Sequence, residues 1–382
     1  MTATVFPWRC GNTVQLHMEG ERFMPAMLAA IAAARQQLDL EFYLLEEGAC
    51  AAALVEALQA ACQRGVRVRC LFDALGGRRF ALSARRLQAA GVALRWYNPL
   101  GWRHGLRNLH RDHRKLLLVD ARVAWVGGTG ITDHFWHPQQ GSRWHELMVE
   151  VAGPVVADWQ QLFEQQWRAC AADCPWQPVR APLSPLPPMP LPGAGLARVA
   201  YADAHEHRDI LQSLLRQIQQ ARQRVWLVTP YFLPGWKVRR ALRRAARRGV
   251  EVRLLLAGAH SDHPPVHHAA QRYYLRLLKN GVRIFEYQPR FLHCKVVLVD
   301  DWVTLGSCNF DRWTLRYNLE ANLEVLDPVF THTLSQALAH DFAEAREVTL
   351  SIWQARPWWQ RLLRRLWGWA DQVVINHLDR WR

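Results

Sequence analysis

A histidine–lysine pattern occurs twice in the chain and restricts its fold more than any other feature. Residues 113–120 have the sequence HRKLLLVD, and residues 293–300 have the sequence HCKVVLVD. In each copy the histidine and the lysine begin an apolar run, and since side chains alternate along a strand, both point to the same face. A cation beside an imidazole is suited to holding a phosphate oxygen while the ring reacts at phosphorus. The pattern predicts a duplicated strand that carries phosphate chemistry.

The segments around each copy are repeated as well. A Gly-Gly or Gly-Ser turn follows, at residues 127–128 and 306–307, and Arg-Gly-Val occurs at residues 64–66 and 248–250. Each Arg-Gly-Val ends a helix on glycine and precedes a strand. Strands that alternate with helices predict βαβ units with right-handed crossovers. We therefore expect an α/β fold of two duplicated lobes, each a mainly parallel mixed sheet flanked by helices.

Proline marks the connection between the lobes. Residues 175–195 are rich in proline and have little periodicity, which is typical of an extended linker. We expect the first lobe at residues 1–174, the second at 196–350, and a Trp/Arg-rich amphipathic segment at 351–382.

Composition restricts the partners. The formal charge is +15 at pH 7 and the pI is about 10.0, which predicts an anionic partner, either nucleic acid or an anionic lipid surface. The 8 cysteines have no disulfide or zinc spacing, so reduced, cytosolic thiols are expected. Neither a signal-peptide core nor an apolar stretch of membrane-spanning length is evident, so contact with lipid is expected to be peripheral.

The C-terminal segment has the pattern of an interfacial helix. Trp358, Leu362, Leu366 and Trp369 form one helical stripe, with arginines beside it. Tryptophan and leucine on one flank with arginine on the other suit a lipid headgroup region, although such a stripe can also pack on the protein itself. The expected membrane contacts are Trp358, Trp359, Arg361, Arg364, Arg365, Trp367 and Trp369.

A second basic feature is a helix without acidic residues. The cations of this helix cover one broad face. Because no acidic residue lies between them, i,i+4 ion pairing cannot explain the run. A solvated surface is the alternative to attraction toward anionic headgroups, and nucleic acid could use the same face. The residues are Lys237, Arg239, Arg240, Arg243, Arg244, Arg247 and Arg248.

Taken together, these residues resemble the phospholipase D superfamily, whose signature is His-x-Lys, four residues, Asp, and then a Gly-Gly or Gly-Ser turn. Residues 11–12, 19–21, 309–312 and 318–322 are similar to segments of bacterial cardiolipin synthases, above all the short kind without N-terminal transmembrane helices. The resemblance covers most of the chain. It implies that the two motifs meet at the lobe interface in one active site.

The resemblance also implies roles. His113 would be the nucleophile that forms a phosphohistidine, and His293 the general acid and base. Lys115 and Lys295 would hold the non-bridging oxygens of the phosphate, whose negative charge grows in the transition state. An aspartate at the end of a strand, as at Asp120 and Asp300, more often caps the turn than contacts the substrate. The predicted catalytic residues are His113, Lys115, Asp120, His293, Lys295 and Asp300. The predicted supporting residues are Glu146, Glu320, Asn309 and Ser307.

One position departs from the family pattern. Gly130 stands where the first motif usually has asparagine, so one amide donor is missing, and Thr129 or a backbone N–H is a candidate substitute. His263, His267 and His268 cluster in sequence, but nothing else supplies ligand geometry. We therefore expect no metal and no cofactor, since two histidines suffice for the chemistry.

The leading functional hypothesis is cardiolipin synthesis by phosphatidyl transfer. One phosphatidylglycerol, or another phospholipid, would donate its phosphatidyl group to a second phosphatidylglycerol and release glycerol. One alternative is a phospholipase D-type hydrolase or a nuclease, in which water replaces the alcohol as the acceptor. Another is a catalytically inactive scaffold that binds membranes. The expected partners are anionic phospholipids (phosphatidylglycerol and cardiolipin) rather than nucleic acid, at the cytoplasmic side of a bacterial membrane.

Overall fold

The computed structural model describes residues 6–170, 195–203, 209–311 and 314–355. Contacts group these residues into two compact units. The first unit contains the described residues within 1–213, 301–308 and 313–334. The second unit contains those within 214–300, 309–312 and 335–382.

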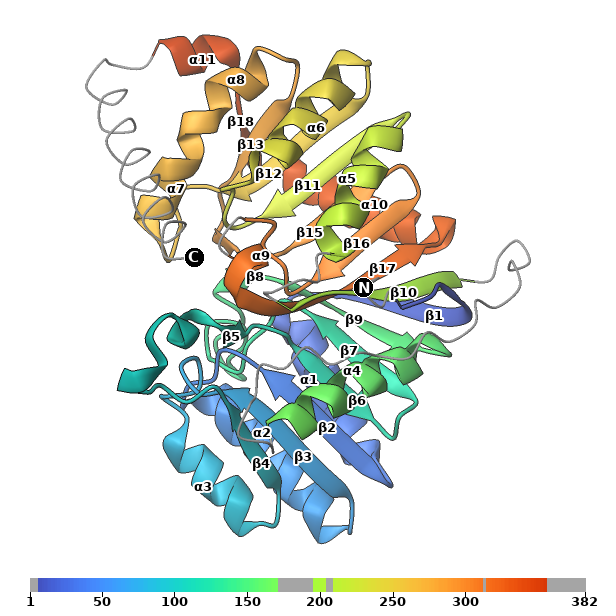
Figure 1. Ribbon diagram of the computed structural model, residues 1–382, viewed down its shortest axis with the longest axis vertical. Coiled ribbons are helices and arrows are strands. Elements are labelled where there is room, and N and C mark those ends of the chain that lie inside the picture. Colours follow the sequence, from blue (N-terminus) through green and yellow to red (C-terminus); the bar gives the residue numbers. More distant parts are fainter. Residues whose placement is uncertain (1–5, 171–194, 204–208, 312–313, 356–382) are drawn as a thin grey trace. The chain divides into compact units, whose positions relative to one another are not determined.

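The first unit is built on a mixed sheet with the strand order β16-β17-β10-β1-β9-β7-β6-β2-β3-β4 (Figure 1). Its strands are β1 (Arg9–Met18), β2 (Gln37–Phe42), β3 (Arg67–Asp73), β4 (Ala93–Tyr97), β5 (Arg111–Asp112), β6 (Leu116–Val119), β7 (Val123–Gly127), β8 (Trp144–His145), β9 (Leu147–Ala152), β10 (Gly195–Asp203), β16 (Trp302–Gly306) and β17 (Asn318–Leu326). Its helices are α1 (Gly20–Ala33), α2 (Ala49–Gln63), α3 (Ala81–Ala89), η1 (Trp102–Leu109), α4 (Val155–Ala169) and α9 (Thr314–Tyr317).

The second unit contains a smaller mixed sheet with the order β18-β13-β12-β11-β15 (Figure 1). Its strands are β11 (Arg224–Thr229), β12 (Glu251–Ala257), β13 (Arg283–Tyr287), β14 (Phe291–Leu292), β15 (Val296–Val299) and β18 (Ala345–Val348). Its helices are α6 (Trp236–Arg247), α7 (Pro264–Ala270), η2 (Gln271–Tyr273), α8 (Tyr274–Leu278) and α11 (Leu350–Gln354). Two helices begin in the first unit and end in the second: α5 (Asp209–Gln220) and α10 (Pro328–Ala343).

The expected α/β architecture with a mixed sheet in each repeat is confirmed, but the parallel share is smaller than expected. Parallel pairing joins β2, β3 and β4 in one unit and β11, β12 and β13 in the other. The ladders that continue from β2 and from β11 are antiparallel. The reason is the connection, since parallel neighbours need a crossover, whereas β6 and β7 follow one another directly as an antiparallel pair.

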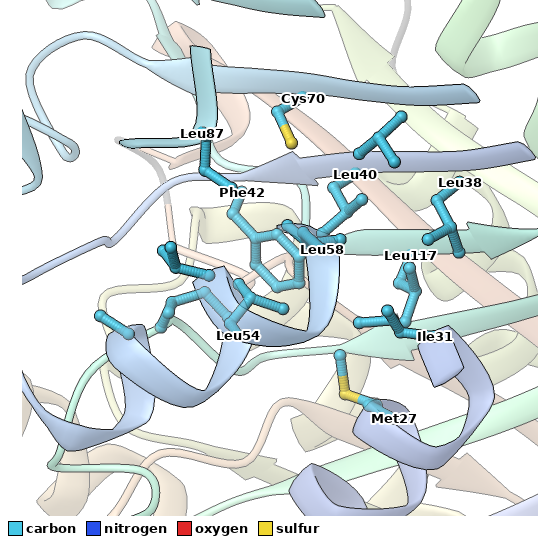
Figure 2. Packing of buried hydrophobic residues seen from close by; sticks show 14 of the residues in the cluster. Met27, Ile31, Leu38, Leu40, Phe42, Leu54, Leu58, Cys70, Leu87 and Leu117 are labelled. Carbon is cyan, nitrogen blue, oxygen red and sulfur yellow. The ribbon is translucent and has the colours of Figure 1, made fainter. Parts of the chain in front are cut away.

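The core of the first unit lies between helices and sheet (Figure 2). Leu40 and Phe42 of β2 lie beside Leu54 and Leu58 of α2, while Leu38 of the same strand lies toward Ile31 of α1, and each of these side chains is at most 1% exposed. Burying a leucine or phenylalanine side chain contributes about 1.5–3 kcal/mol, so this layer holds β2 firmly. The strand that follows His113 and Lys115, β6, is paired with β2, so this layer also fixes the position of β6.

Both Arg-Gly-Val segments end a helix and precede a strand, as predicted. Gly65 has φ +85° and Gly249 has φ +89°, a conformation that favours glycine. Arg64 donates a hydrogen bond from Nη2 to the carbonyl of Ile31 (3.0 Å), and Arg248 does the same to Ile218 (3.1 Å). The duplication therefore extends to individual hydrogen bonds that join consecutive helices.

The expected lobe boundaries stay a prediction. Of the expected linker at 175–195 only Gly195 is described, and of the segment 351–382 only the first five residues are. Within the described ranges, no helix is both long enough and apolar enough to span a bilayer.

Candidate active site

The first motif is held by a strand that follows the second motif in sequence. Strand β5, just before His113, pairs in parallel with β17, and the His113 N–H donates to the carbonyl of Leu319 (3.0 Å). The predicted strand begins later than expected, at Leu116, so His113 and Lys115 lie in a segment without regular secondary structure ahead of β6. Within the first unit, residues from the two sequence repeats therefore build one structure around His113.

Glu320 faces His113. His113 Nδ1 lies 2.9 Å from Glu320 Oε1, and the carboxylate is fully buried. The carboxylate accepts hydrogen bonds from the Ser307 hydroxyl and from Asn318 Nδ2, the latter at 3.2 Å. In the sequence Glu320 is much nearer to His293 than to His113. The position of β17 nevertheless places its carboxylate beside the ring of His113. A buried carboxylate at Nδ1 favours the tautomer with the proton on Nδ1 and the lone pair on Nε2.

Glu146 is the counterpart of Glu320. The two glutamates hold matching positions relative to the ladders β7–β9 and β16–β17, and Glu146 is 1% exposed. Where Ser307 donates to Glu320, the first repeat has Gly128, and a Cβ at Gly128 would lie 2.2 Å from Glu146 Oε2. The Gly-Gly turn therefore leaves room for a carboxylate, and the Gly-Ser turn supplies a hydroxyl to one.

The second motif places lysine directly on its histidine. Lys295 Nζ lies 2.8 Å from His293 Nδ1, and it also donates to the carbonyl of His293. The exposed fractions of Lys295 and His293 are 1% and 8%, and the edge of Phe291 packs on the ring at 5.7 Å between centroids. The same Nζ lies 3.3 Å from Nε2, so the ammonium is within reach of both ring nitrogens.

Asn309 is buried in the second unit next to the end of β11. Its carbonyl accepts a hydrogen bond from Thr229 Oγ1 (2.9 Å), and the residue is 5% exposed. Its side-chain Oδ1 makes no hydrogen bond to any described residue. A buried carboxamide held by its backbone with a polar atom unused is suited to binding a ligand.

The first motif has no equivalent amide. A Cβ at Gly130 would lie 2.7 Å from the carbonyl oxygen of Leu44, so an asparagine does not fit this backbone. The Thr129 hydroxyl donates to the carbonyl of Gly130 (3.0 Å) and is fully buried, so it has a partner already. The geometry gives no support to Thr129 as the substitute donor.

Asp120 and Asp300 fasten the end of each motif strand to the start of another. The carboxylate of Asp120 accepts three backbone N–H bonds from residues 35–37 at 2.7–3.0 Å, and that of Asp300 accepts three from residues 222–224 at 2.9–3.0 Å. Burial acts to raise the pKa of each carboxyl, but the three donors outweigh it and lower the pKa. These contacts give both aspartates a structural task at a turn.

Tyr43 is a site residue that the sequence reasoning did not single out. Its ring meets that of His113 edge-on at 4.8 Å, and Lys115 Nζ lies 5.4 Å from its centroid. Burial, with the charge of Asp73, raises the pKa of Tyr43 to about 12, so the hydroxyl stays protonated. Its position directly after β2, beside the motif strand, was the only available signal.

A buried charged cluster lies behind the first motif and was also missed. Arg114 Nη1 lies 3.4 Å from Glu41 Oε1, and all three members, Glu41, Asp112 and Arg114, are at most 3% exposed. Burial and then the neighbouring Glu41 raise the pKa of Asp112 well above its usual range. In the second repeat the matching positions are apolar and buried: Val228, Leu292 and Cys294.

Other histidines have local partners. His145 Nδ1 lies 2.5 Å from Glu19 Oε1, and His267 has Nδ1 at the carbonyl of Ala257 (3.1 Å) and Nε2 at Gln271 (2.8 Å). The expected membrane contacts lie outside the described residues: Trp358, Trp359, Arg361, Arg364, Arg365, Trp367 and Trp369.

Comparisons with known proteins agree with this geometry. The sequence matches the family described as "Cardiolipin synthase, PLD-like domain" over residues 27–167 and 214–344. It is 36% identical to cardiolipin synthase B of Salmonella typhi over 92% of this chain and 86% of the relative. It is 34% identical to cardiolipin synthase A of Pseudomonas putida (strain GB-1) over 90% of this chain and 71% of the relative.

A solved structure shares the fold. The phosphatidylserine synthase of Haemophilus influenzae Rd KW20 has a TM-score of 0.74 and 14% identity, and the match covers 96% of this chain and 94% of that one. Two matched segments of the family correspond to the two repeats that carry the histidine–lysine motifs. The chain therefore belongs to the family of cardiolipin synthases with PLD-like domains.

Proposed function

We propose that the protein is a cardiolipin synthase that transfers a phosphatidyl group between two phosphatidylglycerol molecules. One observation carries the proposal beyond family membership: the histidine of the first motif is oriented by Glu320, which follows the second motif. The first repeat supplies the His113 ring and the second supplies the carboxylate that orients it. This shared construction supports a mechanism in which both motifs act on the same phosphorus atom. By the symmetry of the duplication, Glu146 would orient His293 in the same way.

The first step forms a covalent intermediate. His113 Nε2 attacks the phosphorus of one phosphatidylglycerol, a nitrogen–phosphorus bond forms, and the bond from phosphorus to the glycerol oxygen breaks. The protonated ring of His293 gives its Nε2 proton to the departing alkoxide, so glycerol leaves neutral and the ring becomes a neutral imidazole. The buried carboxylate beside His113 Nδ1 supports this assignment, since it leaves the lone pair of the nucleophile on Nε2.

The second step consumes the acceptor. The terminal hydroxyl of a second phosphatidylglycerol gives its proton to His293, its oxygen attacks phosphorus, and the nitrogen–phosphorus bond breaks to give cardiolipin. Lys115 and Lys295 stabilise the non-bridging oxygens, whose charge grows in both transition states. Asn309 would donate a further hydrogen bond from its buried carboxamide, while Ser307 acts through Glu320.

The lipid partners and the location belong to the same proposal. The substrates are anionic phospholipids, and the enzyme would work as a peripheral protein on the cytoplasmic face of a bacterial membrane. The net charge of +15 supports attraction to such a surface. The Trp/Arg-rich segment at 351–382 would add an interfacial anchor.

A product assay tests the reaction. Purified protein is incubated with phosphatidylglycerol vesicles and the products are identified by mass spectrometry. Cardiolipin with glycerol supports the synthase. Phosphatidic acid would instead identify a hydrolase, in which water takes the place of the second lipid, and cleavage of DNA without lipid turnover would identify a nuclease.

Substitution of the histidines tests the mechanism. His113→Ala and His293→Ala should each reduce turnover by at least ~10²-fold, the usual contribution of a positioned acid or base. With labelled phosphatidylglycerol and rapid acid-free denaturation, the His293→Ala protein should retain protein-bound label and the His113→Ala protein should not. Label on the His113→Ala protein alone would reverse the two roles.

A further inference from the structure

A basic groove lies between α5 and α6, apart from the histidine–lysine motifs. It has a volume of about 460 Å³. Leu215 and Gln219 line it from α5, and the side of α6 contributes Lys237, Arg240 and Arg244. No acidic residue lines the groove.

The amphipathic pattern of α6 explains why these cations face outward. Val238, Ala241, Leu242 and Ala245 are buried toward the sheet, where α6 follows β11 and precedes β12. The lining cations fall on the other side of the helix and are exposed. Within the described part of the chain, none of the three has an acidic partner, so the fold leaves their charge uncompensated.

The excess positive charge on α6 affects the pKa of a neighbouring arginine. Burial, and then Arg276, Arg247, Arg239 and Arg240, lower the pKa of Arg243. Mutual repulsion of this kind disfavours the folded state and is relieved when an anion binds. A solvated surface with alternating charge would give no such effect.

Comparison of α6 with its counterpart in the first repeat shows which of its cations the fold requires. The counterpart of α6 in the first repeat is α2, which contains no lysine or arginine. Arg248, at the far end of the groove, does have a counterpart in Arg64, and both bond to a carbonyl of the preceding helix. Arg248 is therefore structural, whereas the three lining cations of α6 are not needed to build the repeat.

The groove begins beside the catalytic edge of its own sheet. Residues 230–235 connect the end of β11 to Trp236, the first residue of α6, and His293 leads into β15, which pairs with that same end of β11. Trp236 is 57% exposed and lines the groove next to Lys237. An exposed tryptophan beside cations is typical of contact with a lipid headgroup region.

We propose that this groove binds the phosphate of an anionic phospholipid headgroup at the bilayer surface, as a site separate from the reacting phosphorus. The choice of lipid as the occupant rests on the proposed function, since an enzyme that takes two phosphatidylglycerols must reach them in a membrane. The cations and the tryptophan supply the complementary chemistry. A bound headgroup would keep the edge that carries His293 close to the lipid.

A matched pair of double variants tests the proposal on the full-length protein. Arg240→Gln/Arg244→Gln removes two charges that line the groove. Arg216→Gln/Arg247→Gln removes two exposed charges from the same two helices outside it. Binding to vesicles of phosphatidylglycerol and phosphatidylcholine is measured by sedimentation, and turnover is measured in detergent micelles of phosphatidylglycerol.

The groove variant should bind vesicles roughly 10- to 30-fold more weakly, from about 1 kcal/mol per cation near an anionic surface, and the control should change at most about threefold. Turnover in micelles should remain normal in both. Equal losses in the two variants, or none in either, would overturn the proposal. Tighter binding of a short DNA duplex than of vesicles, lost only in the groove variant, would overturn the lipid occupant. Failure of the unsubstituted protein to make cardiolipin would refute the proposed function, whereas the vesicle-binding comparison would still stand.

Discussion

Glu320→Gln is the most incisive change at the site. The carboxylate is fully buried and lies 2.9 Å from His113 Nδ1, and it accepts hydrogen bonds from Asn318 Nδ2 (3.2 Å) and from the Ser307 hydroxyl. A carboxamide of the same shape has one oxygen acceptor and a donating NH₂. The substituted carboxamide therefore leaves at least one of the neighbouring hydrogen-bond donors without an acceptor. If its NH₂ faces Nδ1 of His113, the ring proton moves to Nε2, which is the atom that must attack phosphorus.

The expected loss in kcat is roughly 10²- to 10⁴-fold, the range for a histidine held in the wrong tautomer, with KM nearly unchanged because Glu320 acts through the ring. A loss of ~10³-fold corresponds to about 4 kcal/mol in the activation barrier. Initial rates of cardiolipin formation in detergent micelles give both constants. The pH profile of kcat should also change shape, which a purely structural defect would not cause.

A control on the same strand separates this effect from damage to the fold. Glu324 is also fully buried in β17, and it pairs with Arg198 at 2.7 Å, away from the motif. Glu324→Gln should lower the free energy of unfolding by about 2–3 kcal/mol, since it leaves a buried guanidinium short of one partner. Activity per folded molecule should persist. If Glu320→Gln keeps kcat within threefold of the parent protein, or if both variants lose activity equally, Glu320 is not a positioning residue.

Three further predictions concern stability and space around the motifs. Asp300→Asn should cost about 1–2 kcal/mol at pH 7 with normal activity per folded molecule; because the folded pKa of Asp300 is lowered, the difference in urea unfolding should shrink as the pH falls below about 4. The stability of Asp112→Asn relative to the unsubstituted protein should be greater at pH 8 than at pH 5, because the raised pKa of Asp112 means that the unsubstituted protein loses stability as the pH rises. An equal difference at both pH values in urea unfolding would contradict a raised pKa of Asp112. Gly128→Ala should reduce turnover at least ~10-fold and stability by ~1–3 kcal/mol, because a Cβ 2.2 Å from Glu146 Oε2 must displace that carboxylate; thermal melting and micelle rates measure both effects, and an unchanged rate would remove Glu146 from the site.

Much of the fold could be predicted because its signals are local. Arg64 and Arg248, each followed by glycine and valine, marked the helix ends, and φ values of +85° and +89° at those glycines explain why. The apolar runs after His113 and His293 marked β6 and β15. Parallel pairing was overestimated because strand pairing depends on the path of the connections, which periodicity does not encode.

The site was predictable in its residue types but not in its pairings. Histidine and lysine at fixed spacing indicated phosphate chemistry, yet nothing in the sequence placed Tyr43 on His113 or Asp112 beside Glu41. Those contacts depend on which strands lie side by side. The groove on α6 was visible only as a run of cations, and its walls required α5.

The sequence by itself determined the duplicated α/β units, the two histidine–lysine motifs and the family, because these features depend on neighbours in the chain and on repeated spacing. Only the tertiary structure decided that Glu320 serves His113 and that Gly130 excludes an asparagine. It alone decided that Asp120 and Asp300 fasten strands. The physical reason is that hydrogen bonding and steric exclusion act through space, and β17 brings its carboxylate to a ring far away in the sequence.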